Sequence, residues 1–140
     1  MALSRILLAV LLALMPFAAS AATLTVKVGN IDPKGGILRL SLYDEASWSK
    51  DGAQPVASAN APAVAPETTV ILKDLAPGVY GVKTYQDANN NGKFDQNWLG
   101  LPEERYGFSN NASPVLSEPG FDKTKFTLHD GDNEISIRLQ

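Results

Sequence analysis

A segment of nine residues, 87–95, carries oxygen-bearing side chains at the spacing of a calcium loop. It reads Asp-Ala-Asn-Asn-Asn-Gly-Lys-Phe-Asp, which matches the first nine positions of the EF-hand loop. Calcium is a hard cation that prefers oxygen ligands, and side chains at alternate positions converge on one point when the chain curls. Gly92 falls where such a loop must turn sharply. The segment therefore predicts a Ca²⁺ site.

The predicted site is not an ordinary EF-hand, because its last ligand is missing. An EF-hand loop ends on a bidentate glutamate, whereas this chain has Trp98 at that position. A carboxylate from elsewhere would have to complete the shell, with Glu103 and Glu104 nearest in sequence and Asp44 able to approach in space. The alternative is a polar turn without an ion, since Asn-Gly pairs are common in loops. The predicted ligands are Asp87, Asn89, Asn91, Lys93 through its main-chain carbonyl, Asp95 and Glu104.

The stretch that follows this loop is unusually rich in aromatic residues. Trp98, Tyr106 and Phe108 lie within eleven residues of one another, interspersed with Asn and Glu. Such side chains can stack on a sugar or hold a peptide. The alternative, which we favour, is that they fold back and pack the loop onto the sheet.

Catalysis and nucleic-acid binding find no support in the sequence. His129 is the only histidine and there is no cysteine, so no zinc-ligand spacing is present. The Gly-x-Ser-x-Gly elbow of α/β-hydrolases is also missing. The chain has 12 Lys+Arg and 15 Asp+Glu, a net charge of −3, and no basic patch, which argues against a nucleic-acid partner. We predict no catalytic residue.

The N-terminal segment 1–22 has the features of a secretory signal peptide. Arg5 gives it a basic start, residues 6–17 are largely apolar, and residues 19–21 supply the small side chains that a signal peptidase requires. The apolar run is shorter than the ~20 residues of a membrane span. We therefore expect cleavage, no membrane span afterwards, and one domain over 23–140 that is periplasmic or secreted.

Alternating apolar and polar residues predict short β-strands along this domain. Segments 24–28 and 37–43 form a predicted antiparallel hairpin, and a second hairpin is predicted where residues 130–132 join the last two strands. The other predicted strands cover 68–72, 79–86, 123–128 and 133–139. Six or seven strands at this spacing indicate an all-β fold of about seven strands, a sandwich with Greek-key connections, with a barrel as the alternative.

Two long segments interrupt the predicted strands. Residues 44–66 form an irregular excursion that is either mobile or packs through Trp48 and Val56. Residues 87–120 form the second and include the predicted calcium loop.

A turn at Pro77-Gly78 is followed two residues later by Tyr80. Pro presets its backbone angle and Gly accepts a positive φ, so the pair forms a tight turn. The hydroxyl of Tyr80 can then reach back and donate to the main chain, as in the tyrosine corner of Greek-key sandwiches. The alternative is an ordinary turn followed by a core aromatic, and either role is structural.

Three motifs together resemble the bacterial DUF2141 family. They are Asp-Leu-x-Pro-Gly-x-Tyr from residue 74, the calcium-like loop from residue 87, and Gly-Leu-Pro-x-Glu-x-Tyr-Gly-Phe-Ser-Asn-Asn-Ala over 100–112. The resemblance covers 24–139 and is most specific in the last motif. It implies an exported protein of unknown function with an immunoglobulin-like or prealbumin-like sandwich.

The sequence leaves three functional hypotheses open. The first is a binding or structural module whose calcium-stabilised loop presents a surface to an envelope protein or glycan. The second is an accessory protein or enzyme that acts on envelope glycans or polymers, with two close, buried carboxylates beside Trp98 and Tyr106 as its signature. The third is a transport or chaperone role that uses an open, uncharged edge strand.

Overall fold

The computed structural model describes residues 21–140, which contain eight strands, two α-helices and a 3₁₀ helix, all three helices short. Residues 1–20 of the predicted signal peptide lie outside the described residues. Along residues 21–140 no helix has the length and hydropathy to cross a membrane. The elements are β1 (Ala22–Gly29), β2 (Ile37–Tyr43), α1 (Glu45–Trp48), β3 (Ala57–Pro62), β4 (Glu67–Leu75), β5 (Gly78–Asp87), β6 (Tyr106–Phe108), η1 (Ser109–Asn111), α2 (Phe121–Thr124), β7 (Phe126–Leu128) and β8 (Gly131–Arg138).

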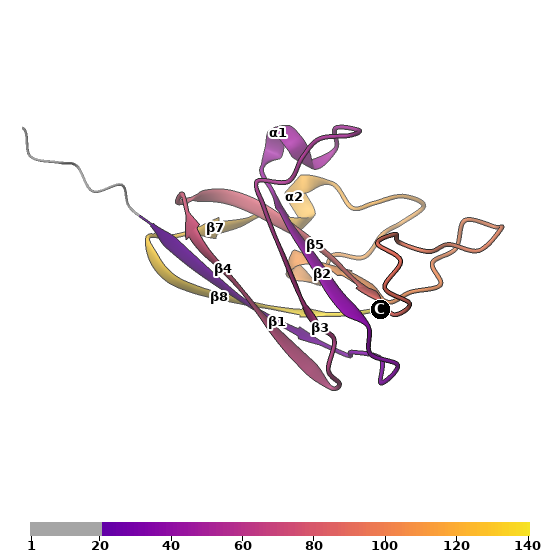
Figure 1. Ribbon diagram of the computed structural model, residues 1–140. Helices are drawn as coiled ribbons and strands as arrows, with labels where there is room; N and C mark the ends of the chain where they lie inside the picture. Colours follow the sequence, from indigo (N-terminus) through magenta and orange to yellow (C-terminus); the bar gives the residue numbers. More distant parts are fainter. Residues whose placement is uncertain (1–20) are drawn as a thin grey trace, which may run out of the picture.

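The strands form two sheets that pack face to face (Figure 1). One sheet has three strands in the order β4-β1-β8, and the other has the order β3-β2-β5-β6, with β7 pairing the beginning of β5. The predicted all-β sandwich is confirmed, with eight strands in place of about seven. The finer immunoglobulin-like or prealbumin-like Greek-key arrangement stays a prediction.

Strict alternation along the strands builds the core between the sheets. In β1 the side chains of Leu24, Val26 and Val28 are fully buried, and the intervening residues face outward. The same pattern buries alternate leucines of β2, as the period of two requires when one face of a sheet is covered. Apolar residues of β4, β5, β7 and β8 complete the cluster.

Both predicted hairpins are wrong, although the strands themselves form. β1 and β2 lie in different sheets, because β1 pairs with β4 on one side and with β8 on the other. β7 and β8 are likewise separated, since β7 pairs with β5 and β8 runs parallel to β1. Alternation shows which face of a strand is buried, whereas the partner strand depends on contacts far apart in the sequence.

The first long excursion, 44–66, contains structure that the alternation pattern did not predict. α1 buries Trp48, as one alternative expected, but Val56 is exposed. β3 then pairs with β2 along its whole length. Its residues are small (Ala, Ser, Asn and Pro) and carry little of the apolar alternation that marks a strand. Similarly, the predicted strand 123–128 begins as α2 and becomes strand only over 126–128.

β3 is an edge strand without a charged residue, which is the feature that the chaperone hypothesis requires. It ends on Pro62, however, which has no backbone N–H to offer an added strand. A proline at the edge is a common protection of a sheet.

The predicted hydrogen bond from Tyr80 back to the main chain is confirmed, whereas Gly78 does not adopt the positive φ expected of it, and Asp74 is the residue of this corner with a positive φ. The hydroxyl of Tyr80 donates to the carbonyl of Ala76 at 2.7 Å, and the ring is buried in the core. This hydrogen bond fixes the turn before β5 to the larger sheet.

Candidate functional site

Asp87, the last residue of β5, anchors the predicted calcium loop. Its carboxylate is fully buried and accepts hydrogen bonds from the backbone N–H groups of Asn91 (3.1 Å) and Gly92 (2.8 Å). The Nε of Arg39, on the neighbouring strand β2, donates to the same carboxylate at 2.7 Å. The side chain therefore fixes both the first turn of the loop and the end of the sheet.

The surroundings of Asp87 keep it ionised. Burial acts to raise the pKa of this carboxyl, but the hydrogen bonds from Arg39 and from the Gly92 and Asn91 amides outweigh burial. The net effect is a pKa below the ordinary value, as expected where hydrogen-bond donors point at the charged form.

Asn89, Asn91 and Asp95 converge at the centre of the loop. The side-chain amide of Asn89 donates to the carboxylate of Asp95 at 2.9 Å, and that of Asn91 donates to both Asp95 oxygens at 2.8 and 2.9 Å. The amide oxygen of Asn91 accepts the backbone N–H of Lys93. These three side chains thus face one another across the loop.

Glu104 closes the loop from further along the chain. One of its carboxylate oxygens accepts the N–H of Ala88 at 3.0 Å and the other accepts the N–H of Asp95 at 2.8 Å. It therefore ties the beginning and end of segment 88–95 together. Glu103, the neighbouring candidate, is exposed, and its backbone N–H donates to the carbonyl of Asp95.

The remaining candidates lie away from this centre. Asp44 caps helix α1, where it accepts the N–H of Ser47, and hydrogen bonds from Ser47 lower its pKa. Trp98 is 91% exposed at the loop tip. Lys93 has an exposed side chain, and only its main chain belongs to the loop turn. Within residues 21–140, no group of three or more His, Cys, Asp or Glu side chains is arranged to hold a metal ion, and the loop instead mixes amide and carboxylate oxygens.

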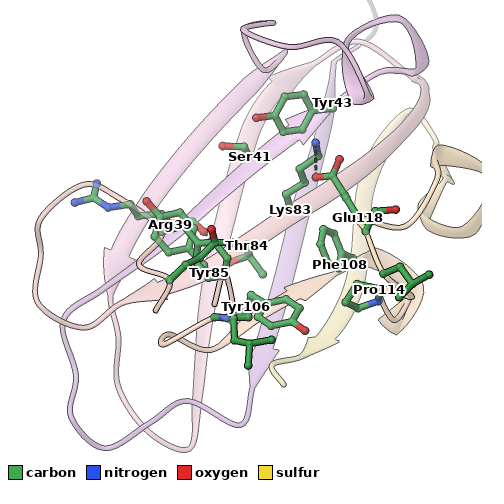
Figure 2. A pocket seen from close by; sticks show the side chains of 17 residues that line it. Arg39, Ser41, Tyr43, Lys83, Thr84, Tyr85, Tyr106, Phe108, Pro114 and Glu118 are labelled. Carbon is green, nitrogen blue, oxygen red and sulfur yellow. Dashed lines mark hydrogen bonds and ion pairs between the residues drawn. The ribbon is translucent and has the colours of Figure 1, made fainter. Parts of the chain in front are cut away.

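A groove beside this loop lies on the outer face of the five-stranded sheet (Figure 2). Its floor follows from the register of three antiparallel strands, β2, β5 and β6. Cross-strand neighbours form two complete rows, and Tyr43 of β2 begins a third. The rows are Ser41–Lys83–Phe108 and Arg39–Tyr85–Tyr106.

Two long loops wall this floor and enclose a volume of about 620 Å³. Figure 1 shows both loops projecting from the same side of the sandwich. Segment 88–105 contributes Phe94, Leu101 and Pro102, and segment 112–120 contributes Leu116 and Glu118 among others. The volume falls within the range of sites that hold small ligands.

Most aromatic rings of the groove pack against one another edge to face. Tyr85 meets Phe94 at 5.4 Å between ring centroids, Phe94 meets Tyr106 at 5.8 Å, and Tyr106 meets Phe108 at 6.0 Å. The favoured alternative, that these aromatic residues pack the loop onto the sheet, is wrong for Trp98, which points into solvent, and Tyr106 and Phe108 are themselves strand residues of the sheet that line the groove.

The charged side chains of the groove are paired. Lys83 lies 2.7 Å from Glu118, and Arg39 donates both to Asp87 and, at 2.9 Å, to Asn90. Burial raises the pKa of Tyr85, more than the nearby charge of Arg39 lowers it. Tyr85 is therefore a neutral phenol at physiological pH.

Sequence reasoning did not identify the groove. The period of two in 37–43 and 79–86 does place Arg39, Ser41 and Tyr43 on the face opposite the core, together with Lys83 and Tyr85. That signal could have indicated an outer polar and aromatic face. It could not indicate that β6 and Glu118 lie beside it, because those contacts join distant parts of the chain.

Comparison with known protein families identifies the family of this chain. A family described as an uncharacterized protein conserved in bacteria (DUF2141) matches residues 26–136. The chain belongs to the DUF2141 family. The match spans most of the chain, including the loop and the groove, and the family description assigns no activity. Comparisons with curated proteins and with solved structures found no match.

Proposed function

We propose that this DUF2141 protein is an exported binding module that takes a ligand into the groove between loops 88–105 and 112–120. The observation that carries this proposal is a groove of about 620 Å³ whose floor and walls are largely aromatic and aliphatic. Concave sites of this size, lined by apolar side chains with a few polar groups, are the usual form of a small-ligand site.

The composition of the groove favours binding over acid-base catalysis. Among the described residues that line it, Glu118 is the only carboxylate, and it is paired with Lys83. An enzyme that hydrolyses glycans needs two carboxyl groups that flank the bond to be cleaved. The lining therefore gives no support to the hypothesis of an enzyme acting on envelope polymers.

The binding proposal is tested with phenylnaphthylamine, an uncharged probe that fluoresces strongly in apolar sites. We expect saturable binding to the wild-type protein. Ser41→Trp places an indole on the groove floor and should remove most of that binding, because the volume is filled. Thr25→Trp, on the outer face of the other sheet, is the matched control and should bind like the wild type. Equal binding by all three proteins would exclude the groove as the site.

We also propose that Ca²⁺ orders the 88–105 loop, with Asp87, Asn89, Asn91, Asp95, Glu104 and the Lys93 carbonyl as its ligands. Each carboxylate oxygen has two lone pairs, and one of the Asp87 oxygens and both of the Glu104 oxygens accept a single hydrogen bond. Rotating the Asn89 and Asn91 amides would present their oxygens to the same centre, in exchange for the hydrogen bonds that these oxygens accept from the N–H groups of Asn91 and Lys93. The donor set therefore fits a hard cation.

The calcium proposal predicts a higher melting temperature in millimolar Ca²⁺. Few formal charges surround the site and Arg39 adds a positive one, so affinity belongs to the weak extracellular class, roughly 10⁻⁴ to 10⁻³ M. At ten times that dissociation constant, binding adds about 1.4 kcal/mol to the free energy of unfolding, or about 5 °C. Asp95→Asn should remove the shift, because it takes a charge from the shell and leaves the anchor at Asp87 intact. Glu103→Gln removes the same charge at the residue before Glu104 and should keep the shift. A melting temperature of the wild type that does not change with Ca²⁺ would contradict the site.

We infer that the protein is exported, a location that would suit the proposed calcium site. A periplasmic or extracellular location would expose the loop to the Ca²⁺ concentrations that a weak site needs. Ala22 is the first residue of β1 and is fully buried, so a signal peptidase would have to cut close to the first ordered strand. The mass of the mature protein recovered from the cell envelope or medium tests this, and an intact N-terminus in the cytoplasm would contradict it.

A further inference from the structure

Lys83 occupies the centre of the groove floor with its ammonium group partly withdrawn from water. The ammonium donates to the carbonyl of Trp48 at 2.8 Å and lies 4.5 Å from the ring centroids of both Tyr43 and Trp48. Its side chain is 24% exposed. A cation in such surroundings gains from an anionic partner, because water supplies less of its solvation.

That partner is Glu118, which reaches the groove from the exposed segment 112–120. Its carboxylate lies 2.7 Å from the Lys83 ammonium, and its side chain is 42% exposed (Figure 2). Val115 and Leu116 of the same segment are among the most exposed apolar residues of the described chain. Since half-exposed ion pairs contribute little to stability, an incoming anion could replace Glu118 at small cost.

The second cation of the groove is not available in this way. Arg39 is held by the buried carboxylate of Asp87 and by Asn90, which are both part of the loop anchor. Replacing Asp87 would break the hydrogen bonds that fix the loop. The groove therefore offers one exchangeable anion position.

We propose that the groove binds a small organic monoanion, whose apolar or aromatic body lies over Tyr85, Tyr106 and Phe108. Its carboxylate takes the position of Glu118 at Lys83. This inference rests on the proposed binding function and names the class of ligand. Glu118 thus occupies the anion position at Lys83 until the ligand binds.

The test compares two probes that share an aromatic skeleton, anilinonaphthalene sulfonate and uncharged phenylnaphthylamine. Lys83→Met keeps the aliphatic stem and should weaken sulfonate binding about tenfold or more, the effect of losing a hydrogen bond to a charged group. Glu118→Gln frees Lys83 and should tighten sulfonate binding by about two- to fivefold, the effect of a half-exposed ion pair. Both variants should bind the uncharged probe as the wild type does.

Glu134→Gln is the matched control, because it removes a half-exposed carboxylate that pairs with Lys27 on the opposite sheet. It should change neither probe. Phenylpropionate should displace the sulfonate from the wild type, and phenylpropionamide, its neutral amide, should not. If Lys83→Met fails to fold by circular dichroism, tighter sulfonate binding by Glu118→Gln and unchanged binding by Glu134→Gln decide the matter.

The outcomes separate this inference from the function on which it rests. Absence of binding by the uncharged probe would overturn the proposed groove function itself. If the uncharged probe binds, but neither Lys83→Met nor Glu118→Gln changes the affinity for the sulfonate, only the anion site is overturned. Displacement by an acidic peptide or oligosaccharide, but not by phenylpropionate, would assign the groove to an envelope protein or glycan and overturn the small monoanion.

Discussion

A single carboxylate, that of Asp87, connects the sheet, the loop and one wall of the groove. It ends β5, holds the N–H groups of the loop turn, and fixes Arg39 on the groove floor. Charged hydrogen bonds of this kind are stronger than neutral ones. Asp87 therefore has a structural role whether or not an ion is present.

The lowered pKa of Asp87 predicts a dependence of stability on pH. Because the folded pKa lies below the ordinary value of 3.8, the ionised group stabilises the fold at higher pH, and this stability is lost as pH falls through the folded pKa. Asp87→Asn should lower the free energy of unfolding by about 1–2 kcal/mol at neutral pH, because Arg39, the partner of this buried carboxylate, is itself 25% exposed to solvent. Urea unfolding should show a smaller difference from the wild type near pH 3. Asp122→Asn, a highly exposed control, should have little effect at either pH, and a constant difference for Asp87→Asn would contradict the linkage.

Among the elements, β5 organises the outer face of the larger sheet. It pairs with β2 along one side and with β6 and β7 along the other. Helix α1, whose Asp44 and Ser47 form a capping box, places Trp48 over β5 at Gly81. Trp48 in turn packs near Phe108 and Phe121, so this short helix is held against the sheet next to Phe108 of the groove.

Close packing of Trp48 on β5 predicts that Gly81 tolerates no side chain. A Cβ at this position would lie 2.6 Å from an indole carbon of Trp48 and 2.9 Å from the hydroxyl of Thr124. Gly81→Ala should lower the free energy of unfolding by about 1–3 kcal/mol, the range found for overpacked cores, and should alter the fluorescence of Trp48. Gly29→Ala is a suitable control, because no atom lies within 4 Å of the place that its added Cβ would occupy. Equal free energies of unfolding for the two variants would show that helix α1 is loosely held.

For the molecule as a whole, the sequence predicted which face of each strand is buried better than it predicted which strands pair with each other. The period of two identified β1, β2, β4, β5 and β8, because half-buried strands must alternate. It missed β3, where small residues give no apolar signal, and it misjoined β1 to β2. The loop 87–95 was found because its residues are contiguous, whereas the groove unites β2, β5, β6 and Glu118 and needs the three-dimensional register.

The parallel pairing of β1 with β8 has a consequence for biogenesis. β1 is the central strand of its sheet, and all eight of its residues pair with β8, from Ala22 with Gly131 to Gly29 with Arg138. Until the ribosome has synthesised residue 138, the nascent chain lacks the complete β8, which is one of the two neighbours of β1. Closing so long a loop is slow, so this sheet forms late in synthesis, a property that would suit the proposed export through a translocation channel.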